Sequence, residues 1–478
     1  MSVPAVVIAA PASGSGKTTL ATGLIGALRR AGHVVAPFKV GPDYIDPGYH
    51  GLAAGRPGRN LDPVLVGAER VVPLYQHGTR GCDLAVVEGV MGLFDGRIDE
   101  NHAGPVAEGS TAQVASLLGA PVILVVDARG HSQSLAALLH GFATFDSGIR
   151  LGGVILNRVG SERHDQVLRA ACARVGLPVL GSLPRMAELE VPSRHLGLIP
   201  AVEHGTAATA AVAAMTDLVA AHVDLAAIAA LARSTVAGPA WDPSEAVAPS
   251  TSDGRGADPH VPVSQPASSD GPVIAMAGGP AFTFGYAEHR ELLSAAGARV
   301  ATFDPLHDEL PSGTAGLVLP GGFPEEHAAD LAANSRLLKS VRELAGLGLP
   351  MHAECAGLLY LTRSLDGHPM AGVLDVDAEF GPRLTLGYRD AVALVDSVLW
   401  RAGERVRGHE FHRTRLISTG TDAAAWGWHG SRGERVREGA LVGNVHASYL
   451  HTHPVGNPTA TARFVAAADD FASARVAG

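Results

Sequence analysis

Short apolar runs rich in β-branched residues recur through the first half of the chain. They occupy residues 6–10, 33–40, 83–88, 121–127, 152–157 and 177–183. Runs of this length and composition are typical of strands buried on both faces, whereas the stretches between them, such as residues 20–30, have the spacing of a helix. Strands that alternate with helices over roughly 200 residues predict a doubly wound, mostly parallel α/β sheet.

The pattern changes at residues 237–270, where Pro, Ser, Gly and Asp dominate and periodic hydrophobic positions are scarce. Such a composition is typical of a flexible linker. A second set of apolar runs follows, with expected strands at 272–277, 299–303 and 316–319, a helix at 287–296, and a strand, sharp turn and helix over 349–361. We therefore expect an N-terminal domain (1–236), a linker (237–270) and a C-terminal α/β domain (271–478).

Composition narrows the class of protein without identifying it. The 478 residues carry a formal net charge of −10, and 46% of them are hydrophobic. A chain of this length can form two or three domains, and its acidic balance argues against general nucleic-acid binding, which needs a basic surface. No apolar run approaches the ~20 residues of a membrane span, and the start of the chain lacks the basic segment of a secretory signal. Cys82, Cys172 and Cys355 provide no disulfide framework, so we expect a cytoplasmic protein.

The first apolar run leads into the segment APASGSGKTT and then into the helical stretch 20–30. This order of strand, loop and helix is typical of a phosphate-binding loop. Gly14 and Gly16 would let backbone N–H groups approach phosphate oxygens, and the helix N-terminus would add its positive dipole end. Lys17 would reach the outer phosphates, and Thr18 would offer its hydroxyl to Mg²⁺. Pro11 replaces the first glycine of the G-x-x-x-x-G-K-[ST] pattern, and an ordinary glycine-rich turn is the alternative interpretation.

Two later strands also end in polar residues. The run 33–40 passes into FKVGPDYIDPGYH, which brings Lys39, Asp43 and Asp46 into one loop, and the run 83–88 ends in Glu88 before a glycine-rich turn. Ligands of open α/β sheets bind beyond the carboxyl ends of the strands, so both segments are candidate site elements. A solvated turn stabilised by Asp side chains is the alternative for the first segment.

Residues 349–361 (LPMHAECAGLLYL) have the outline of a nucleophile elbow. Small residues at Ala353 and Gly357 permit the tight bend that lifts one side chain above the edge of a sheet. The thiol of Cys355 would lie at the start of a helix, where the dipole lowers the thiol pKa and favours the thiolate. A cysteine in an apolar segment is more often a buried core residue, and the elbow pattern is what favours a nucleophile here.

Histidines gather in the last third of the chain, within GHEFH and NVHASYLHTH. They are His409, His412, His446, His451 and His453. The spacing of H-E-F-H is not the H-E-x-x-H of a helical zinc site, so a metal-free role is favoured. Alternation over residues 449–453 predicts a strand with His451 and His453 on one face. One imidazole would then activate Cys355 while the other orients it.

Taken together, these segments resemble the cobyrinic acid and hydrogenobyrinic acid a,c-diamide synthases of cobalamin biosynthesis. The resemblance covers nearly the whole chain and rests on APASGSGKTT, FKVGPDYIDPGYH, VVEGVMGLFDG, PGGFPE, HAECAGLLYL, LTLGYR, GHEFH and ASYLHTH. It implies two doubly wound α/β domains, a P-loop domain like dethiobiotin synthetase and a class I glutamine amidotransferase domain of flavodoxin-like fold. The implied enzyme is a ligase that uses ATP, Mg²⁺ and glutamine to amidate the a and c carboxylates of a corrin.

By this resemblance, Cys355 would attack the side-chain amide of glutamine, release ammonia and form a glutamyl thioester. His451 would act as base and then as acid, and the backbone N–H groups near Gly322 and Ala356 would form the oxyanion hole. The class I family usually carries a glutamate two residues after this histidine. Here that position is His453, which is therefore only a candidate for the third catalytic role.

In the N-terminal domain, the resemblance implies that ATP phosphorylates a corrin carboxylate and that ammonia converts the acyl phosphate to an amide. ATP would be bound by the P-loop and two neighbouring strands, through Gly14, Gly16, Lys17, Thr18, Thr19, Lys39 and, at the adenine, Asn157. The corrin site would be shaped by Asp43, Tyr44 and Asp46, and Mg²⁺ would be held by Thr18, Asp46 and Glu88. Amidation would proceed on the c and then the a side chain, with ammonia passing between the domains.

Three other functions share parts of this pattern. A partitioning-type ATPase carries a lysine where this loop has Ala12, and an inactive glutaminase would not be expected to retain both Cys355 and His451. A cobyric acid synthase, which amidates other corrin carboxylates, is the nearest alternative, and the GPDYIDP loop favours the a,c enzyme. The expected partners are small molecules (a corrin polycarboxylate, ATP and glutamine), with no nucleic acid and no membrane. A homodimer is compatible with the pattern, and whether the ring carries cobalt is left open.

Overall fold

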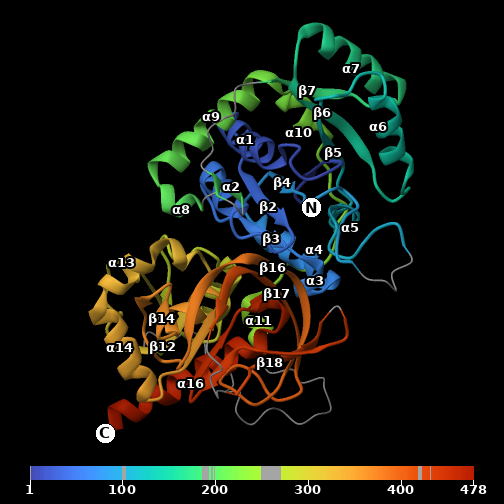
Figure 1. The fold of residues 1–478 in the computed structure, drawn as a ribbon. Helices are drawn as coiled ribbons and strands as arrows, with labels where there is room; N and C mark the ends of the chain where they lie inside the picture. Colours follow the sequence, from blue (N-terminus) through green and yellow to red (C-terminus); the bar gives the residue numbers. More distant parts are fainter. Residues whose placement is uncertain are drawn as a thin grey trace. The chain divides into compact units, whose positions relative to one another are not determined.

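The computed structural model describes residues 2–98, 104–185, 193–194, 197–198, 200–248, 271–417, 423–430 and 432–477. The chain divides into two compact units, Met1–Trp241 and Asp242–Gly478. Figure 1 draws the first unit in blue to green and the second mainly in yellow to red. The boundary between the units falls inside the predicted linker 237–270.

The first unit is built on a parallel sheet. Within the described residues, seven strands pair in the order β3-β2-β4-β1-β5-β6-β7, and every pair is parallel. The strands are β1 (Ala5–Ala9), β2 (Val35–Val40), β3 (Arg59–Leu61), β4 (Leu84–Glu88), β5 (Val122–Asp127), β6 (Leu151–Val159) and β7 (Val179–Pro184). All six apolar runs of the sequence form strands of this sheet, which confirms the predicted doubly wound pattern. The edge strand β3 was not predicted, because three residues are too few to show a hydrophobic period.

Helices cover both faces of this sheet. They are α1 (Lys17–Arg30), α2 (Asp46–Ala54), α3 (Pro63–Val66), α4 (Ala68–Gly78), α5 (Thr111–Leu118), α6 (Leu135–Thr144), α7 (Glu162–Arg174), α8 (Ala201–His204), α9 (Thr206–His222) and α10 (Leu225–Leu231), and a small pair of strands, β8 (Ser193–Arg194) and β9 (Gly197–Leu198), precedes α8. Figure 1 shows α9 running alongside α1, which follows the P-loop. A Cβ at Gly23 would collide with the carbonyl oxygen of Met215, and one at Gly26 would collide with the hydroxyl of Thr216. Glycine therefore allows the close packing that holds α1.

The second unit holds a six-stranded sheet. Among the described residues the order is β11-β10-β12-β13-β21-β20, parallel except for the edge pair β20–β21. The strands are β10 (Val273–Ala277), β11 (Arg299–Phe303), β12 (Thr314–Leu319), β13 (Met351–Glu354), β20 (Ala440–Val442) and β21 (Val445–Ser448). Successive residues of β12 face different cores, since Leu317 and Leu319 belong to one cluster and Val318 belongs to the other. Both faces of the sheet are thus covered, as in other doubly wound folds.

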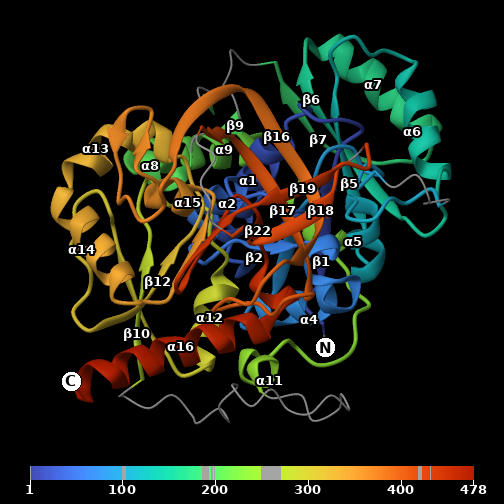
Figure 2. The ribbon, with the colours of Figure 1, turned by 60° about the horizontal axis from the view of Figure 1, so that its bottom comes forward.

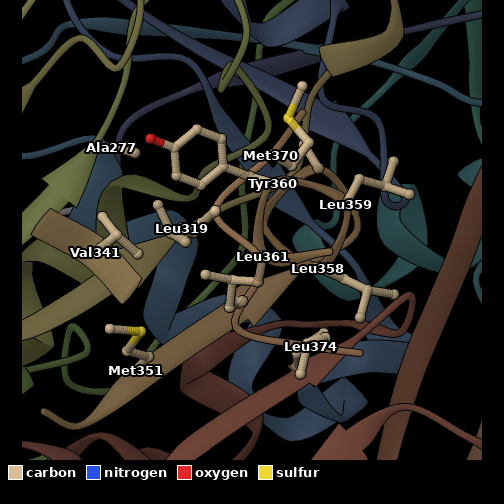
Figure 3. Close-up of a cluster of buried hydrophobic side chains, with 14 of the residues drawn as sticks. Ala277, Leu319, Val341, Met351, Leu358, Leu359, Tyr360, Leu361, Met370 and Leu374 are labelled. Atoms are coloured by element: carbon tan, nitrogen blue, oxygen red, sulfur yellow. The ribbon is translucent and has the colours of Figure 1, made fainter. Parts of the chain in front are cut away.

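One core surrounds the short helix α15 (Ala356–Leu361). Figure 3 shows its side chains among Leu319 of β12, Met351 of β13 and Val341 of α14 (Ser335–Gly346). A helix of one to two turns is not stable in isolation, so its packing must hold it in place. This core therefore fixes the start of α15, directly after Cys355.

The other face carries α12 (Ala287–Ala295) and α16 (Pro458–Ala477), which Figure 2 shows side by side. The short helix α11 (Pro243–Val247) packs on both of them, although it lies within the predicted linker; residues 249–270 of that linker lie outside the described residues. The remaining helical segments of the unit are η1 (Pro324–His327), α13 (Ala328–Ala333) and η2 (Pro454–Gly456). In the described parts of both units, no helix is long and apolar enough to cross a membrane.

A largely antiparallel sheet in the second unit was not predicted. Two long strands, β16 (Asp377–Ala393) and β17 (Arg405–Leu416), pair with each other, and β17 also pairs with the short strand β22 (His451–Thr452). The sheet also includes β14 (Ser364–Leu365), β15 (His368–Pro369), β18 (Trp426–His429) and β19 (Arg435–Glu438). The β16–β17 register shifts between Phe380 and Thr385, around a Gly-Pro step, so no clean alternation is visible in the sequence. This sheet brings residues 409–411 next to the predicted Cys–His site.

Candidate active sites

The P-loop connects β1 and α1, as the sequence predicts. Gly14 and Gly16 have φ angles of 77° and 92°, in the left-handed region that favours glycine. A Cβ at Gly16 would collide with Nδ2 of Asn157, which donates a 2.9 Å hydrogen bond to the carbonyl oxygen of Ser15. Asn157 therefore supports the backbone of the loop, and its role in adenine recognition stays a prediction.

A second support for the loop was not recognised from the sequence. Nη1 of Arg158 donates to the carbonyl oxygen of Gly14 (2.9 Å) and pairs with Oδ2 of Asp127 (2.6 Å). Arg158 has a φ of 61°, a conformation that a residue with a side chain keeps only when its surroundings hold it. A cavity of about 660 Å³ lies beside these groups, lined by loop residues 11–15 and by Asp127 and residues 129–131. Its size lies in the range of small-molecule sites.

Lys17 is buried at the start of α1, with Thr19 in the same turn. Its Nζ donates a 2.6 Å hydrogen bond to the carbonyl oxygen of Met91, in the turn after β4. Burial, followed by repulsion from Lys39, lowers the pKa of Lys17. The segment VVEGVMGLFDG therefore touches the P-loop through its backbone, whereas the sequence pointed only to the carboxylate of Glu88.

Thr18, Lys39, Asp46 and Glu88 meet at the carboxyl end of the sheet. Oγ1 of Thr18 lies 2.8 Å from Oε1 of Glu88 and 3.1 Å from Oδ2 of Asp46. Nζ of Lys39, predicted to face phosphates, lies 2.6 Å from Oδ2 of Asp46 and 2.9 Å from Oε1 of Glu88. The three predicted Mg²⁺ ligands are thus close together, with an ammonium group bound between the carboxylates.

The carboxylates of this cluster have opposite pKa shifts. Burial, followed by the charge of Asp43, raises the pKa of Asp46 to about 7. Burial acts in the same direction on Glu88, but Lys39 and His50 outweigh it and lower the pKa of Glu88 to about 2. Nε2 of the fully buried His50, one helical turn after Asp46, lies 2.7 Å from Oε2 of Glu88. Carboxylate and hydroxyl oxygens in an acidic cluster fit a hard divalent cation such as Mg²⁺.

The loop before α2 is also held by a residue that sequence reasoning missed. Nδ2 of the buried Asn60 donates to the carbonyl oxygen of Asp43 (2.7 Å) from the edge strand β3. Oδ1 of Asp43 accepts the backbone N–H of Asp46 (2.9 Å), so Asp43 also stabilises the start of α2. Tyr44, which lies between Asp43 and Asp46 in the sequence, is half-buried. Only the folded sheet brings Asn60 to this loop, and no local motif marks it.

Cys355 lies at the bend between β13 and α15, which confirms the predicted order of strand, turn and helix. Its φ of 49° is the strained conformation typical of a nucleophile elbow. A Cβ at Gly357 would collide with the carbonyl oxygen of Leu319, so glycine allows α15 to pack closely on β12. Ala353 is fully buried in β13. Both small residues are therefore needed for the close packing of the elements on either side of the bend.

The thiol differs from the expected low-pKa thiolate. Burial, followed by the carboxylate of Glu325, raises the pKa of Cys355 above its ordinary value. Hydrogen bonds from the backbone N–H groups of Ala356 and Gly322 to Sγ lower it only in part. The expectation is wrong because the thiol is 2% exposed and the helix behind it has only six residues. The two predicted oxyanion donors are nevertheless both at the nucleophile.

His451 lies in β22, paired with His409 of β17. A Cβ at Gly321 would collide with Cε1 of His451, so the imidazole packs on the turn whose next residue, Gly322, binds Sγ of Cys355. This turn therefore adjoins both predicted catalytic side chains. Burial lowers the pKa of His451 to about 4, against the opposing effect of Glu354, so the ring is neutral at pH 7 and can accept a proton.

His453 does not share the strand with His451. The prediction of a strand over residues 449–453 is wrong at both ends, because β22 contains only His451 and Thr452 and Pro454 begins η2. Nδ1 of His453 accepts the backbone N–H of Val455 (3.3 Å), and its ring centroid lies 4.1 Å from that of Tyr286. Its catalytic role stays a prediction.

Of the other histidines of the region, His409 is paired with His451, His412 lies farther along the same strand β17, and His446 lies in β21. Burial lowers the pKa of His409 and of His446 to about 3, and the ring of His412 stacks on Tyr449 at 3.8 Å between centroids. Within the described ranges, no group of three or more His, Cys, Asp and Glu side chains is arranged to hold a metal ion.

Comparison with known proteins agrees with this geometry. Residues 6–199 match the CobQ/CobB/MinD/ParA nucleotide binding domain, and residues 273–458 match the CobB/CobQ-like glutamine amidotransferase domain. The chain is 62% identical to the hydrogenobyrinate a,c-diamide synthase of Mycobacterium bovis, over 98% of both chains. It is 58% identical to the enzyme of that name from Streptomyces coelicolor, over 97% of both chains, and 42% identical to the cobyrinate a,c-diamide synthase of Gloeobacter violaceus, over 96% of both.

Proposed function

The chain belongs to the family of hydrogenobyrinate and cobyrinate a,c-diamide synthases, and we propose that its own substrate is the metal-free hydrogenobyrinic acid. It is a glutamine-dependent, amide-forming ligase of cobalamin biosynthesis that amidates the a and c side-chain carboxylates. The proposal of a metal-free substrate is supported by sequence identity. The chain is 62% and 58% identical to enzymes named for hydrogenobyrinate and 42% identical to one named for cobyrinate.

In the proposed reaction, the site at Cys355 releases ammonia from glutamine. Sγ bonds to the amide carbon while the thiol proton moves to His451, and the N–H groups of Gly322 and Ala356 bind the oxygen that becomes negative. His451 returns the proton to the amide nitrogen, the C–N bond breaks and ammonia leaves, and water later hydrolyses the thioester. One oxyanion donor is typically worth about 3 kcal/mol of transition-state stabilisation.

The P-loop site activates the corrin carboxylate. A free carboxylate resists attack by ammonia because oxide would have to leave, whereas an acyl phosphate releases phosphate. Backbone N–H groups at Gly14 and Gly16 and the ammonium of Lys17 hold the phosphate oxygens during transfer from ATP. Thr18, Asp46 and Glu88 are the residues that would hold Mg²⁺, which neutralises phosphate charge when bound.

The surface beside α2 suits the apolar ring of such a substrate. A groove of about 580 Å³ is lined by Gly48 and Leu52 of α2 and by residues 201–209 in part. Leu52 and Val202 are 44% and 60% exposed there. Leu52 lies six residues after Asp46, about 9 Å along the helix at 1.5 Å per residue. The two side chains also lie about 120° apart around the helix axis, so a ring that covers Leu52 would have to extend around α2 for its peripheral carboxylates to approach the Asp46 cluster.

The substrate is tested by giving the purified protein ATP, Mg²⁺, glutamine and either hydrogenobyrinic or cobyrinic acid, and analysing the products by mass spectrometry and NMR. We expect the a,c-diamide, with a higher kcat/KM for the metal-free ring. Equal or faster turnover of the cobalt ring would overturn the substrate assignment. Amides at side chains other than a and c would instead indicate activity of the cobyric acid synthase type.

The separation of the two sites is tested with Cys355→Ala. This variant should lose amidation from glutamine and retain amidation from ammonium salts, because only the source of ammonia is removed. Loss of both activities in a folded protein would contradict two separate sites.

A further inference from the structure

In the structure, a residue other than His453 lies close enough to His451 to be the third member of the Cys–His site. Oε2 of Glu354 lies 3.9 Å from Nδ1 of His451, and Glu354 is the last residue of β13, immediately before Cys355. We propose that Glu354, rather than His453, orients the imidazole of His451 during glutamine hydrolysis. This inference rests on the proposed glutaminase role of Cys355 and His451, and it makes Glu354 a positioning residue.

The carboxylate of Glu354 is itself held in place. Its Oε1 accepts the backbone N–H of Thr452 (3.0 Å) and the hydroxyl of Thr452 (2.8 Å), and it lies 3.2 Å from Nε2 of His352. These contacts occupy Oε1, while Oε2 is the oxygen on the side of His451. Because Thr452 directly follows His451, the same carboxylate fixes both the backbone and the ring orientation of the catalytic strand β22.

The charge at this position suits the reaction. Burial acts to raise the pKa of Glu354, but His352, His451 and Thr452 outweigh it and lower the pKa to about 2, so the group is a carboxylate at neutral pH. His451 is fully buried, and an imidazolium formed there needs a neighbouring negative charge. When Cys355 gives its proton to His451, the carboxylate of Glu354, which lies 3.9 Å from Nδ1, stabilises the imidazolium by its negative charge and remains ionised.

His453 is engaged elsewhere. Its Nδ1 accepts the N–H of Val455, and its ring packs on Tyr286, as described above. A histidine at this position also supplies no fixed negative charge for an imidazolium. In this chain, the carboxylate near His451 therefore comes from Glu354, and not from the position two residues after the histidine, where class I enzymes usually carry a glutamate.

The test is Glu354→Gln, which keeps the shape of the side chain and removes its charge. We expect kcat with glutamine to fall about 100-fold with a smaller change in KM, and the ratio of glutamine-dependent to ammonium-dependent amidation to fall equally. The acid limb of the glutamine pH profile should move to lower pH, because Glu354 raises the pKa of His451. Thr452→Val, which removes one of the contacts to Oε1, should show a smaller fall in the same direction.

Glu438→Gln is the matched control. Glu438 is buried in the same unit, and its two oxygens bind the hydroxyl of Ser448 (2.6 Å) and the N–H of Tyr449 (2.7 Å), just before His451. It should leave the pH profile unchanged. A Glu354→Gln enzyme with wild-type kcat for glutamine, or a pH profile that Glu438→Gln alters equally, would overturn the proposal. If the wild-type protein releases no ammonia from glutamine, the proposed function itself fails before any variant is compared.

Discussion

Gly322 is the position at which a single methyl group tests the oxyanion hole. A Cβ there would collide with the carbonyl oxygen of Ala281 and would lie 2.9 Å from its carbonyl carbon and 3.1 Å from Cα of Phe282. Because these are backbone atoms, the clash in Gly322→Ala is relieved only by a shift of the turn, which moves the Gly322 N–H away from Sγ of Cys355. Loss of one such donor costs about 3 kcal/mol, a factor of about 10²–10³ in kcat.

The assay is the steady-state release of glutamate from glutamine in the presence of ATP and the corrin substrate. We expect the reaction with ammonium salts to continue in Gly322→Ala, since it does not use the oxyanion hole. Gly285→Ala is the control in the preceding segment, because a Cβ at Gly285 meets nothing within 4 Å. A folded Gly322→Ala enzyme with wild-type kcat for glutamine would show that this N–H does not stabilise the transition state.

Four further predictions follow from the two sites. Lys17→Ala should abolish amidation from both glutamine and ammonium while glutaminase activity persists; unchanged amidation would refute the P-loop assignment. His50→Phe removes the imidazole beside Oε2 of Glu88 and should raise the Mg²⁺ concentration for half-maximal amidation about 10-fold, in the range known for groups that orient metal ligands; an unaltered Mg²⁺ titration would contradict this role. Leu52→Asp should raise KM for the corrin and leave KM for glutamine unchanged, and equal changes in both would exclude the groove as the ring site. Because burial lowers the pKa of His451 to about 4, the imidazole is in its base form above that pH, so kcat/KM for glutamine should fall only as the pH approaches 4; an acid limb near pH 6.5 would show an unperturbed histidine.

The meeting of the proposed Mg²⁺ ligands at one edge of the sheet was largely predictable, because these residues are tied to strand ends. Thr18, Asp46 and Glu88 are far apart in the sequence, but each follows or ends a strand of one parallel sheet, and the carboxyl ends of such strands meet at one edge. The supports of that site were not predictable. Arg158 and Asn60 reach it through side-chain contacts to backbone carbonyls, and such contacts leave no local pattern.

The local structure around Cys355 was predictable, and the electrostatics of this proposed glutaminase site were less so. The elbow around Cys355 depends on small residues near the bend, which a sequence displays directly. The raised thiol pKa depends on burial and on Glu325, which lies on another segment. The contact between Glu354 and His451 was not predictable for a different reason. In the sequence Glu354 is only the strand residue before Cys355, and the fold is needed to bring β22 next to it.

The hydrogen bond between Lys17 and Met91 has a thermodynamic consequence for nucleotide exchange. The ammonium already has a 2.6 Å partner inside the protein, and Met91 presents that carbonyl from a left-handed conformation with a φ of 45°. A phosphate bound to Lys17, as we propose, would replace this bond instead of a shell of water, so the net gain in affinity would be smaller than the contact alone suggests. The same exchange would make release of the product nucleotide easier, because the hydrogen bond between Lys17 and the carbonyl oxygen of Met91 forms again.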